Sequence, residues 1–424
     1  MRARIVLPLA FAVMLAVSLI FTSEVLAVFD VSSFPRVEDL PYNAEMPDPL
    51  TFFDGRRVES PADWPAQAEE LRRLYQYYMY GVWPDASREK VGWSIDGNTL
   101  NITVARDGKQ VSFPVNFSVP DPNQVPMPEN GYPVIIAFMW FAQVRQANER
   151  GYAVITVNTQ PIAADNLSRA GVFYELYPYG KTWEEQTGAL MAWAWGASKV
   201  IDALENGVGD QLNINPEHSI AAGVSRWGKA AAVAGAFDQR IKVTVPACSG
   251  AGGMAAFRYV SEGKTYDYSA IGVDAPYKMT QNEPLGSLQS SAERHWFNDN
   301  FLKFKHVNYL PFDQHLLAAL CADPGRYLFI TGSYLYEDWT NPPGMFFTYL
   351  AARKVFDCLG IRDHIAILLH REGHMITDGD LVYLLDFCDY HFYGKEPQVD
   401  LERLTQSLYL EPANFDPAWE PYVD

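Results

Sequence analysis

The sequence predicts an α/β sandwich of three layers, in which helices cover both faces of a mostly parallel central sheet. The first observation is a series of short, wholly apolar runs that alternate with helical patterns. Such runs are typical of parallel strands, which are buried on both faces. The second observation is an earlier segment in which apolar and polar residues alternate, as in antiparallel strands with one solvated face. The apolar runs lie at residues 133–138, 152–157, 219–224, 241–246, 327–331 and 364–369.

The remaining elements are expected in the following order. Residues 28–65 are rich in proline, aspartate and aromatic side chains, which indicates an extended arm, and residues 69–80 have the pattern of an amphipathic helix. Residues 93–119 alternate between apolar and polar side chains and contain two turn signals, which predicts two or three antiparallel strands. Helical patterns cover residues 182–205, 227–237 and 346–359, and a last helix is expected from Leu381.

Length and composition indicate a globular protein. The chain has 424 residues, of which 48% are apolar and 14% aromatic, enough for one large domain with a full core. The 33 basic and 51 acidic residues give a net charge of −18, which argues against nucleic acid and anionic membranes as partners. The four cysteines are too few for a disulfide-built scaffold and lack zinc-site spacing, and their pairing stays open.

The N-terminus has the pattern of a secretory signal peptide. Arg2 and Arg4 precede an apolar stretch, and small residues lead to an expected cleavage after Ala27. We therefore expect a secreted or periplasmic monomer without membrane attachment; the alternative is an uncleaved anchor. The predicted division is a signal peptide at 1–27, an extended arm and helix at 28–85, and one catalytic domain at 86–424.

A serine stands at the corner between an apolar run and an alanine-rich helical pattern. In the stretch GVSRWGK, Ser225 is placed where a strand turns directly into a helix. Such a turn strains the serine backbone and exposes its hydroxyl above the sheet, as in the α/β-hydrolase fold. Ser225 is therefore the candidate nucleophile. The usual pattern has glycine two residues after the serine, but here that position is Trp227 and the glycine is Gly228.

A serine hydroxyl is a weak nucleophile, so it needs a base and an acid that orients the base. In this fold the order along the chain is serine, acid, histidine. His374 lies in a polar loop after the last predicted strand, which suits the base, whereas its competitor His370 falls at the strand end. Glu337 and Asp338 both lie on the loop before that strand, so either can be the acid.

The charge that develops during acyl transfer needs hydrogen-bond donors. We expect one from the backbone N–H of Arg226 and a second from residues 139–141, after the first parallel strand. The Arg226 guanidinium and Lys229, one helical turn further, add positive charge. Cations are disfavoured at the start of a helix, so their presence favours a role in binding an acidic or strongly polar substrate group.

The stretch around Ser225 resembles the GxSRxGK signature of carbohydrate esterase family 15, the glucuronoyl esterases. The resemblance covers about residues 90–395. It implies an α/β-hydrolase fold and hydrolysis of the ester between 4-O-methyl-glucuronic acid of xylan and lignin alcohols, without metal or cofactor. Further segments that resemble the family are GALMAWAWGASKVIDAL, SGAGG at 249–253, HWFNDNF at 295–301, WTNPPG at 339–344, and Gly373-His374 with Asp380.

The resemblance also implies roles for single residues. Ser225 would be the nucleophile, His374 the base, and Arg226 a stabiliser of the oxyanion. Lys229 and Trp339 would hold the uronic acid ring. A further sugar-contacting glutamate of the family has Glu262 as its nearest match.

The acid is where the chain departs from the common family pattern. Many members have a glutamate directly before the SGAGG segment, where this chain has Cys248. Other members place the acid two residues before the tryptophan, which corresponds to Glu337. The resemblance therefore favours Glu337 over Asp338.

Two alternatives stay open at this stage. One is a related carbohydrate esterase such as an acetyl xylan esterase, although Arg226, Lys229 and Trp339 together suit a uronate ring better than an acetyl group. The other is a catalytically impaired carbohydrate-binding relative, suggested by Cys248.

Overall fold

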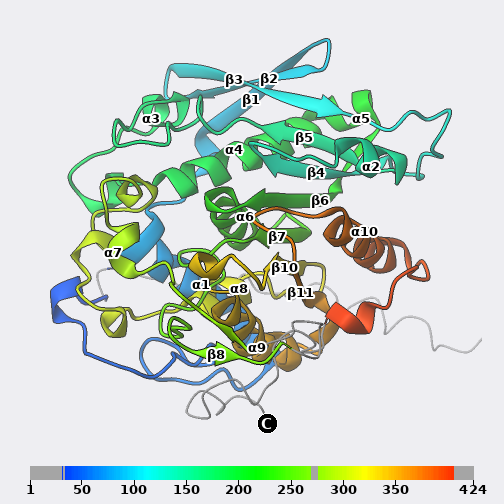
Figure 1. The fold of residues 1–424 in the computed structure, drawn as a ribbon. Helices are drawn as coiled ribbons and strands as arrows, with labels where there is room; N and C mark the ends of the chain where they lie inside the picture. Colours follow the sequence, from blue (N-terminus) through cyan, green and yellow to red (C-terminus); the bar gives the residue numbers. More distant parts are fainter. Residues whose placement is uncertain (1–30, 32–33, 269–275, 405–424) are drawn as a thin grey trace, which may run out of the picture.

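The computed structural model describes residue 31 and residues 34–268 and 276–404, so the predicted signal peptide lies outside the described residues. Its centre is a nine-stranded sheet in the order β1-β2-β3-β5-β4-β6-β7-β10-β11 (Figure 1). The strands are β1 (Glu89–Asp96), β2 (Thr99–Arg106), β3 (Lys109–Ser118), β4 (Tyr132–Phe138), β5 (Ala153–Val157), β6 (Ile214–Val224), β7 (Val243–Ala247), β10 (Tyr327–Ser333) and β11 (Ile365–His370). Strands β8 (Thr265–Tyr266) and β9 (Tyr277–Lys278) form a separate antiparallel pair.

The sheet combines an antiparallel and a parallel part. Strands β1, β2 and β3 form an antiparallel meander, and β3 pairs antiparallel with β5. From β5 onward the neighbouring strands are parallel. Burial follows this division, because β2 alternates between buried and partly exposed residues whereas β4 and β7 are buried throughout. The predicted α/β sandwich is confirmed.

Helices cover both faces of the sheet. The smaller cluster of buried apolar side chains joins one face to α2 and α10, and the larger cluster joins the other face to α1, α4, α6, α8 and α9 (Figure 1). None of the helices in the described part of the chain is long and apolar enough to cross a bilayer. Their bounds are α1 (Trp64–Tyr75), α2 (Val144–Glu149), α3 (Val172–Leu176), α4 (Ala189–Ala203), α5 (Gly209–Leu212), α6 (Arg226–Phe237), α7 (Leu285–Leu288), α8 (Gln314–Ala319), α9 (Pro342–Cys358) and α10 (Asp378–Tyr393).

Several helix boundaries differ from the predicted ones. Helix α1 begins at Trp64 and not at residue 69, and α9 begins at Pro342 and not at residue 346. Two further differences have a local cause. The prediction started a helix at residue 182, but α4 begins only at Ala189, because Gly188 is extended (φ −69°, ψ 158°). A Cβ atom at Gly188 would lie 2.0 Å from the carbonyl oxygen of Trp296, so this glycine marks a close backbone crossing. Helix α10 begins three residues before the predicted Leu381, because Thr377 and Asp380 form a capping box.

The segment before the sheet packs onto the helical layer. Phe34 contacts the rings of Tyr77 and Tyr78, and the Trp64 indole donates a hydrogen bond of 3.0 Å to the carbonyl of Ala322. The Tyr75 hydroxyl donates to the carbonyl of Asp313 at 2.8 Å. These contacts attach the N-terminal segment to α8 and the loops around it, on the side of the sheet that also carries α6.

Candidate active site

The turn between β6 and α6 has the backbone of a nucleophile elbow. Ser225 adopts φ 63° and ψ −128°, and its N–H donates to the carbonyl of Ala247 on the next strand at 2.9 Å. A Cβ atom at Gly223 would lie 2.3 Å from the carbonyl oxygen of Trp227, and one at Gly228 would lie 2.5 Å from that of Ala247. Glycine is therefore required at position 228, where α6 crosses β7, and the partly exposed Trp227 tolerates its side chain. This explains the displaced glycine of the sequence.

The sheet topology gathers the predicted residues at one edge. The register pairs Val224 with Ala247, and Ala247 with Thr331. Ser333 in turn pairs with His370. The loops that follow these parallel strands therefore leave the sheet side by side, and they carry Ser225, Cys248, Glu337 and His374.

His374 and Glu337 are in direct contact. The Nδ1 atom of His374 lies 2.7 Å from Oε2 of Glu337. An ionised carboxylate only accepts hydrogen bonds, so Nδ1 carries the proton and Nε2 keeps its lone pair. This is the tautomer in which a histidine can take a proton from a serine hydroxyl.

Asp338, the other predicted acid, is committed elsewhere. It is 5% exposed, and its carboxylate accepts hydrogen bonds from the Tyr277 hydroxyl and from the N–H and hydroxyl of Thr280, each at 2.7 Å. These bonds fix the acid loop to the segment around β9. Of the two carboxylates left open by the sequence, the structure brings Glu337 to His374.

His370, the other candidate base, is buried against the loop that carries His374. It is 8% exposed, and its Nε2 atom lies 3.0 Å from the carbonyl oxygen of Met375 and 3.4 Å from Oδ2 of Asp380. Burial raises the pKa of the Asp380 carboxyl, and His370 opposes that rise. His370 therefore packs under the loop that carries His374.

Cys248 lies directly before the SGAGG segment, at the end of β7. Its side chain is 1% exposed, and its Sγ atom lies 3.9 Å from the carbonyl oxygen of Met375. Burial raises the pKa of this thiol to about 12, so it stays uncharged at neutral pH. All four cysteines of the chain are free thiols.

Arg226 is held beside the elbow by an acidic partner that the sequence analysis did not identify. Its guanidinium donates to Oδ2 of Asp165 at 2.7 Å and stacks 5.0 Å from the Trp296 ring centre. Asp165 also contacts His295 Nε2 and the Trp296 indole N–H, each at 2.8 Å. Burial opposes ionisation, but hydrogen bonds from His295, Trp296 and Arg226 hold the pKa of Asp165 at about 2.

Lys229 is buried, and its three ammonium hydrogens have protein acceptors. Nζ donates to the carbonyls of Ser249 at 2.8 Å and Ala251 at 2.6 Å and to Oε2 of Glu283 at 2.7 Å. A lysine has three N–H donors, so a sugar oxygen would have to displace one of these acceptors. The SGAGG segment thus acts as part of the lysine site.

Two glutamates near these cations were missed from the sequence. Glu283 pairs with Lys229, and its N–H donates to the carbonyl of Trp339 at 2.9 Å. Burial and the neighbouring Glu283 raise the pKa of Glu293 to about 7, although Lys229 and Arg226 oppose the rise. One buried carboxyl oxygen of Glu293 has no hydrogen-bond partner among the described residues. Nothing local in the sequence distinguishes these two glutamates from surface charges.

The other two predicted sugar-contacting residues, Trp339 and Glu262, lie in different surroundings. Trp339 is 37% exposed and lies in the same loop as Glu337. Glu262 is exposed, and its backbone N–H donates to Asn282 at 2.9 Å. The contacts around Lys229 include Glu283, and Glu262 does not take part in them.

Backbone hydrogen bonds in the loop after β4 reduce the number of residues among 139–141 that can supply the second oxyanion donor. The N–H of Met139 donates to the carbonyl of Val157, and that of Trp140 to the carbonyl of Phe138, each at 2.8 Å. Both amides are therefore occupied in this conformation, which leaves Phe141 as the candidate from this loop. Met139 itself is in a left-handed conformation, with φ 63°.

Comparison with known proteins gives a consistent result. The family model described as "Glucuronyl esterase, fungi" matches residues 102–360. A solved carbohydrate esterase family 15 glucuronoyl esterase from Caldicellulosiruptor kristjansonii is 43% identical, with TM-score 0.81 over 91% of this chain and 98% of that one. The glucuronoyl esterase catalytic domain from Hypocrea jecorina is 31% identical, with TM-score 0.70 over 91% of this chain and 96% of that one.

Two curated relatives are similar over most of this chain. A multidomain esterase from Ruminococcus flavefaciens is 47% identical over 92% of this chain and 51% of its own length. A 4-O-methyl-glucuronoyl methylesterase from Hypocrea jecorina is 35% identical over 79% of this chain and 66% of its own length. The chain thus spans about half to two thirds of the length of these relatives. The matched region contains the serine elbow and the acid loop, and the predicted fold class is that of the solved relatives. The chain belongs to carbohydrate esterase family 15, the glucuronoyl esterases.

Proposed function

We propose that the protein is a glucuronoyl esterase that hydrolyses the ester between 4-O-methyl-glucuronic acid of glucuronoxylan and lignin alcohols by a serine acyl-enzyme route. The observation that carries this proposal is the His374–Glu337 contact of 2.7 Å at the sheet edge that also carries the Ser225 elbow. The names of the curated relatives supply the substrate class.

The first half of the reaction forms the acyl-enzyme. The Ser225 hydroxyl attacks the ester carbonyl carbon while Nε2 of His374 accepts the hydroxyl proton. Glu337 stabilises the resulting imidazolium through Nδ1. The Arg226 backbone N–H and guanidinium stabilise the oxyanion. The C–O bond to the alcohol then breaks, and His374 donates its proton to the departing alkoxide oxygen.

The second half of the reaction restores the enzyme. His374 takes a proton from a water molecule, and the resulting hydroxide attacks the glucuronoyl carbonyl carbon. When the bond to the serine oxygen breaks, His374 returns the proton to that oxygen. The products are the free uronic acid and Ser225 in its starting state.

Recognition of the sugar acid rests on a mixed-charge group beside the serine. Trp339 offers a half-exposed ring for packing against a sugar face. The unpartnered carboxyl oxygen of Glu293 can bind a sugar hydroxyl. Lys229 keeps Glu283 and the SGAGG carbonyls in place and contributes positive charge, and it binds the sugar directly only where a hydroxyl replaces one of its three acceptors.

We also propose that residues 1–27 direct secretion, that residues 28–85 form an arm and helix attached to the catalytic domain at 86–424, and that the mature protein is a monomer. The N-terminal sequence pattern supports secretion, and the contacts of Trp64 and Tyr75 with the main domain support the attachment.

The decisive experiment measures how fast the mature protein hydrolyses each of three substrates. These are benzyl glucuronate, the methyl ester of 4-O-methyl-glucuronic acid, and acetylated xylan. We expect hydrolysis of both glucuronate esters and little acetate release, with Ser225→Ala as the blank. Preferential acetate release would favour an acetyl xylan esterase. Binding of glucuronoxylan without hydrolysis of any ester would favour a carbohydrate-binding relative.

A paired variant tests the assigned acid within the same assay. Asp338→Asn removes a carboxylate that binds Tyr277 and Thr280, whereas Glu337→Gln removes the one that contacts His374. The proposed mechanism requires a much larger loss of kcat from Glu337→Gln. Equal kcat in the wild type and Glu337→Gln would contradict the assignment.

A further inference from the structure

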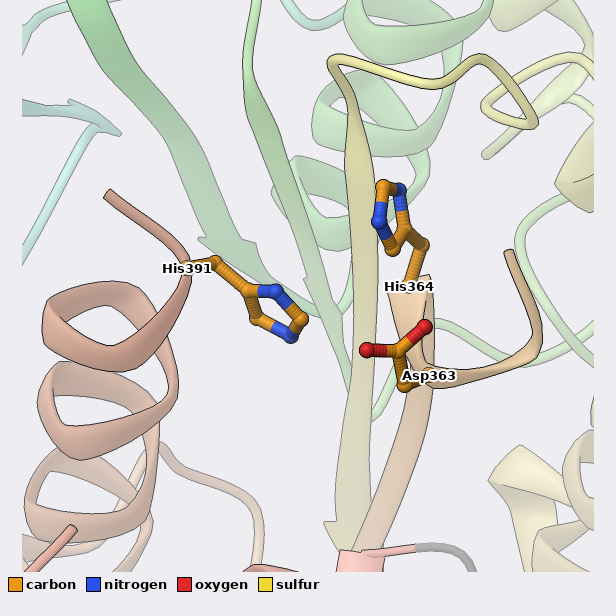
Figure 2. A group of neighbouring side chains, drawn as sticks. All are labelled: Asp363, His364 and His391. Atoms are coloured by element: carbon orange, nitrogen blue, oxygen red, sulfur yellow. The ribbon is translucent and has the colours of Figure 1, made fainter. Parts of the chain in front are cut away.

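A second group of ligand-type side chains lies at the opposite end of the parallel strands from Ser225. Asp363, His364 and His391 each place one possible ligand atom so that all three atoms lie within 4.8 Å of one another. Asp363 and His364 belong to the 3₁₀ turn Arg362–His364 before β11, and His391 belongs to the last turn of α10. Figure 2 shows the three side chains facing a common space between that helix and the turn.

The orientation of His364 suits a metal ligand. Its Nδ1 atom lies 3.1 Å from the carbonyl oxygen of Arg326. A carbonyl only accepts, so Nδ1 carries the proton and Nε2 is left with a free lone pair. A hydrogen bond from the distal ring nitrogen to a carbonyl is the usual way in which proteins orient a metal-binding histidine.

The surrounding contacts hold both histidines in position. The Tyr327 ring lies 4.3 Å from the ring centres of both His364 and His391. The His391 ring centre also lies 4.4 Å from that of Phe387 and 5.3 Å from that of His364. The two imidazoles are therefore packed against a fixed aromatic ring, and Asp363 is the exposed member of the group.

We propose that Asp363, His364 and His391 form a binding site for one zinc ion, with water as a fourth ligand. Two imidazoles and a carboxylate are a ligand set that zinc takes in tetrahedral geometry, with bonds of about 2.0–2.2 Å. Ligand atoms of such a site are about 3.3 Å apart, so the group has to close by no more than roughly 1.5 Å. A cation at this place also neutralises Asp363 and interacts favourably with the C-terminal end of α10.

The proposed zinc site would link the start of β11 to the end of α10. The loop that joins these two elements at their other ends carries His374. Strand β11, the loop with His374, and α10 run from the turn at residue 363 to His391 without interruption. A metal ion bound by both ends stabilises the folded arrangement, because it binds the assembled site and not the unfolded chain. Its contribution is therefore to stability, and the esterase chemistry at Ser225 does not use it.

The test is titration of the mature protein, freed of its tag and stripped with a chelator, with zinc chloride in a calorimeter. We expect one zinc ion per chain and a rise in melting temperature of roughly 2–5 °C at saturation. Magnesium chloride should give neither effect, because magnesium prefers oxygen ligands in octahedral geometry.

Four variants assign the bound ion to this group. His391→Gln and Asp363→Asn should each weaken zinc binding at least tenfold or abolish it. Asp363 is exposed, so Asp363→Asn tests the site even if His391→Gln fails to fold. His374→Ala and the exposed His306→Gln should leave the stoichiometry and affinity unchanged. The proposal is overturned when zinc fails to bind at micromolar concentration, when His374→Ala removes the binding, or when Asp363→Asn leaves the affinity unchanged.

Discussion

The chain leaves the carboxyl ends of the parallel strands through strained turns, whereas buried hydrogen bonds stabilise the amino ends. After β4, β6, β7 and β10 it passes through positive φ angles at residues other than glycine, namely Met139 (63°), Ser225 (63°), Cys248 (43°) and Tyr336 (62°). Each such residue costs of the order of 1–3 kcal/mol. Asn213, before β6, also has a positive φ, but asparagine tolerates that conformation.

At the amino ends, a buried arginine joins several elements of the fold. Arg326, which is 3% exposed, donates to the carbonyls of Gly235, Ile241 and Leu320. This single side chain therefore connects α6, the approach to β7 and the end of α8. The strained residues thus lie at the end of the parallel strands that carries the candidate catalytic side chains, whereas Arg326 links structural elements at the other end.

The largest expected effect concerns the catalytic end. Glu337→Ala removes the carboxylate that orients His374 and should lower kcat by about 10³–10⁴-fold with little change in melting temperature. Steady-state kinetics on benzyl glucuronate measure the loss. A comparable loss in Asp338→Ala with an unchanged fold would show that the acid loop acts as a unit.

A substitution at the amino ends of the strands should lower stability and leave activity nearly unchanged. Arg326→Met leaves three buried carbonyls without their donor and should lower the free energy of unfolding by about 2–4 kcal/mol. Below the melting transition kcat/KM should stay within about twofold of the wild type. The exposed pair of Arg145 with Glu149 supplies the matched control, because Arg145→Met should cost no more than about 0.5 kcal/mol. A large fall in kcat/KM of the folded Arg326→Met protein would remove the proposed separation of roles.

The strain itself can be measured at the nucleophile. Ser225→Gly and Ser225→Ala both remove the hydroxyl, but glycine accepts a positive φ without a steric penalty. Ser225→Gly should therefore be more stable than Ser225→Ala by about 1–3 kcal/mol. Chemical denaturation of the two inactive variants compares them directly. Equal stabilities would mean that the elbow is relaxed in the folded protein.

A smaller effect is expected from pH. Glu293 has a pKa of about 7 in the folded protein, whereas the ordinary value is 4.5. Between these values the unfolded chain binds fewer protons at this position than the folded one, so this group lowers stability as the pH rises. The stability that this carboxyl contributes in its protonated form is fully present below pH 4.5 and is lost as the pH rises through 7. Glu293→Gln should therefore flatten the fall in melting temperature between pH 5 and 7.5, and an unchanged slope would show that the carboxyl titrates normally.

Local sequence patterns predicted the features that depend on neighbours in the chain. The strand-to-helix corner at Ser225 and the loop position of His374 follow from residues within a few positions of each. The contact between His374 and Glu337, 37 residues apart, was favoured only through the family resemblance. The mostly parallel sheet with antiparallel strands at its start was confirmed, because buried apolar runs and alternating runs indicate these two kinds of strand. The order of the strands in the sheet was not predicted, because it depends on contacts between distant segments.

The features that were missed depend on contacts between distant segments. Asp165 reaches Arg226 across 61 residues, and Glu283 reaches Lys229 across 54, so no local pattern marks either carboxylate. The late start of α4 depends on a close approach of the Trp296 backbone to Gly188. The occupied amide of Met139 depends on Val157, a residue of another strand.

Cys248 has a consequence for how the protein withstands oxidants. Disulfide exchange and sulfenic acid formation both proceed through the thiolate. A thiol that is 1% exposed, with a pKa of about 12, presents almost none of that form to solution. The thiol next to the nucleophile elbow is therefore inert toward peroxide and thiol-specific labels, and treatment with such reagents should leave Cys248 unmodified as long as the protein stays folded.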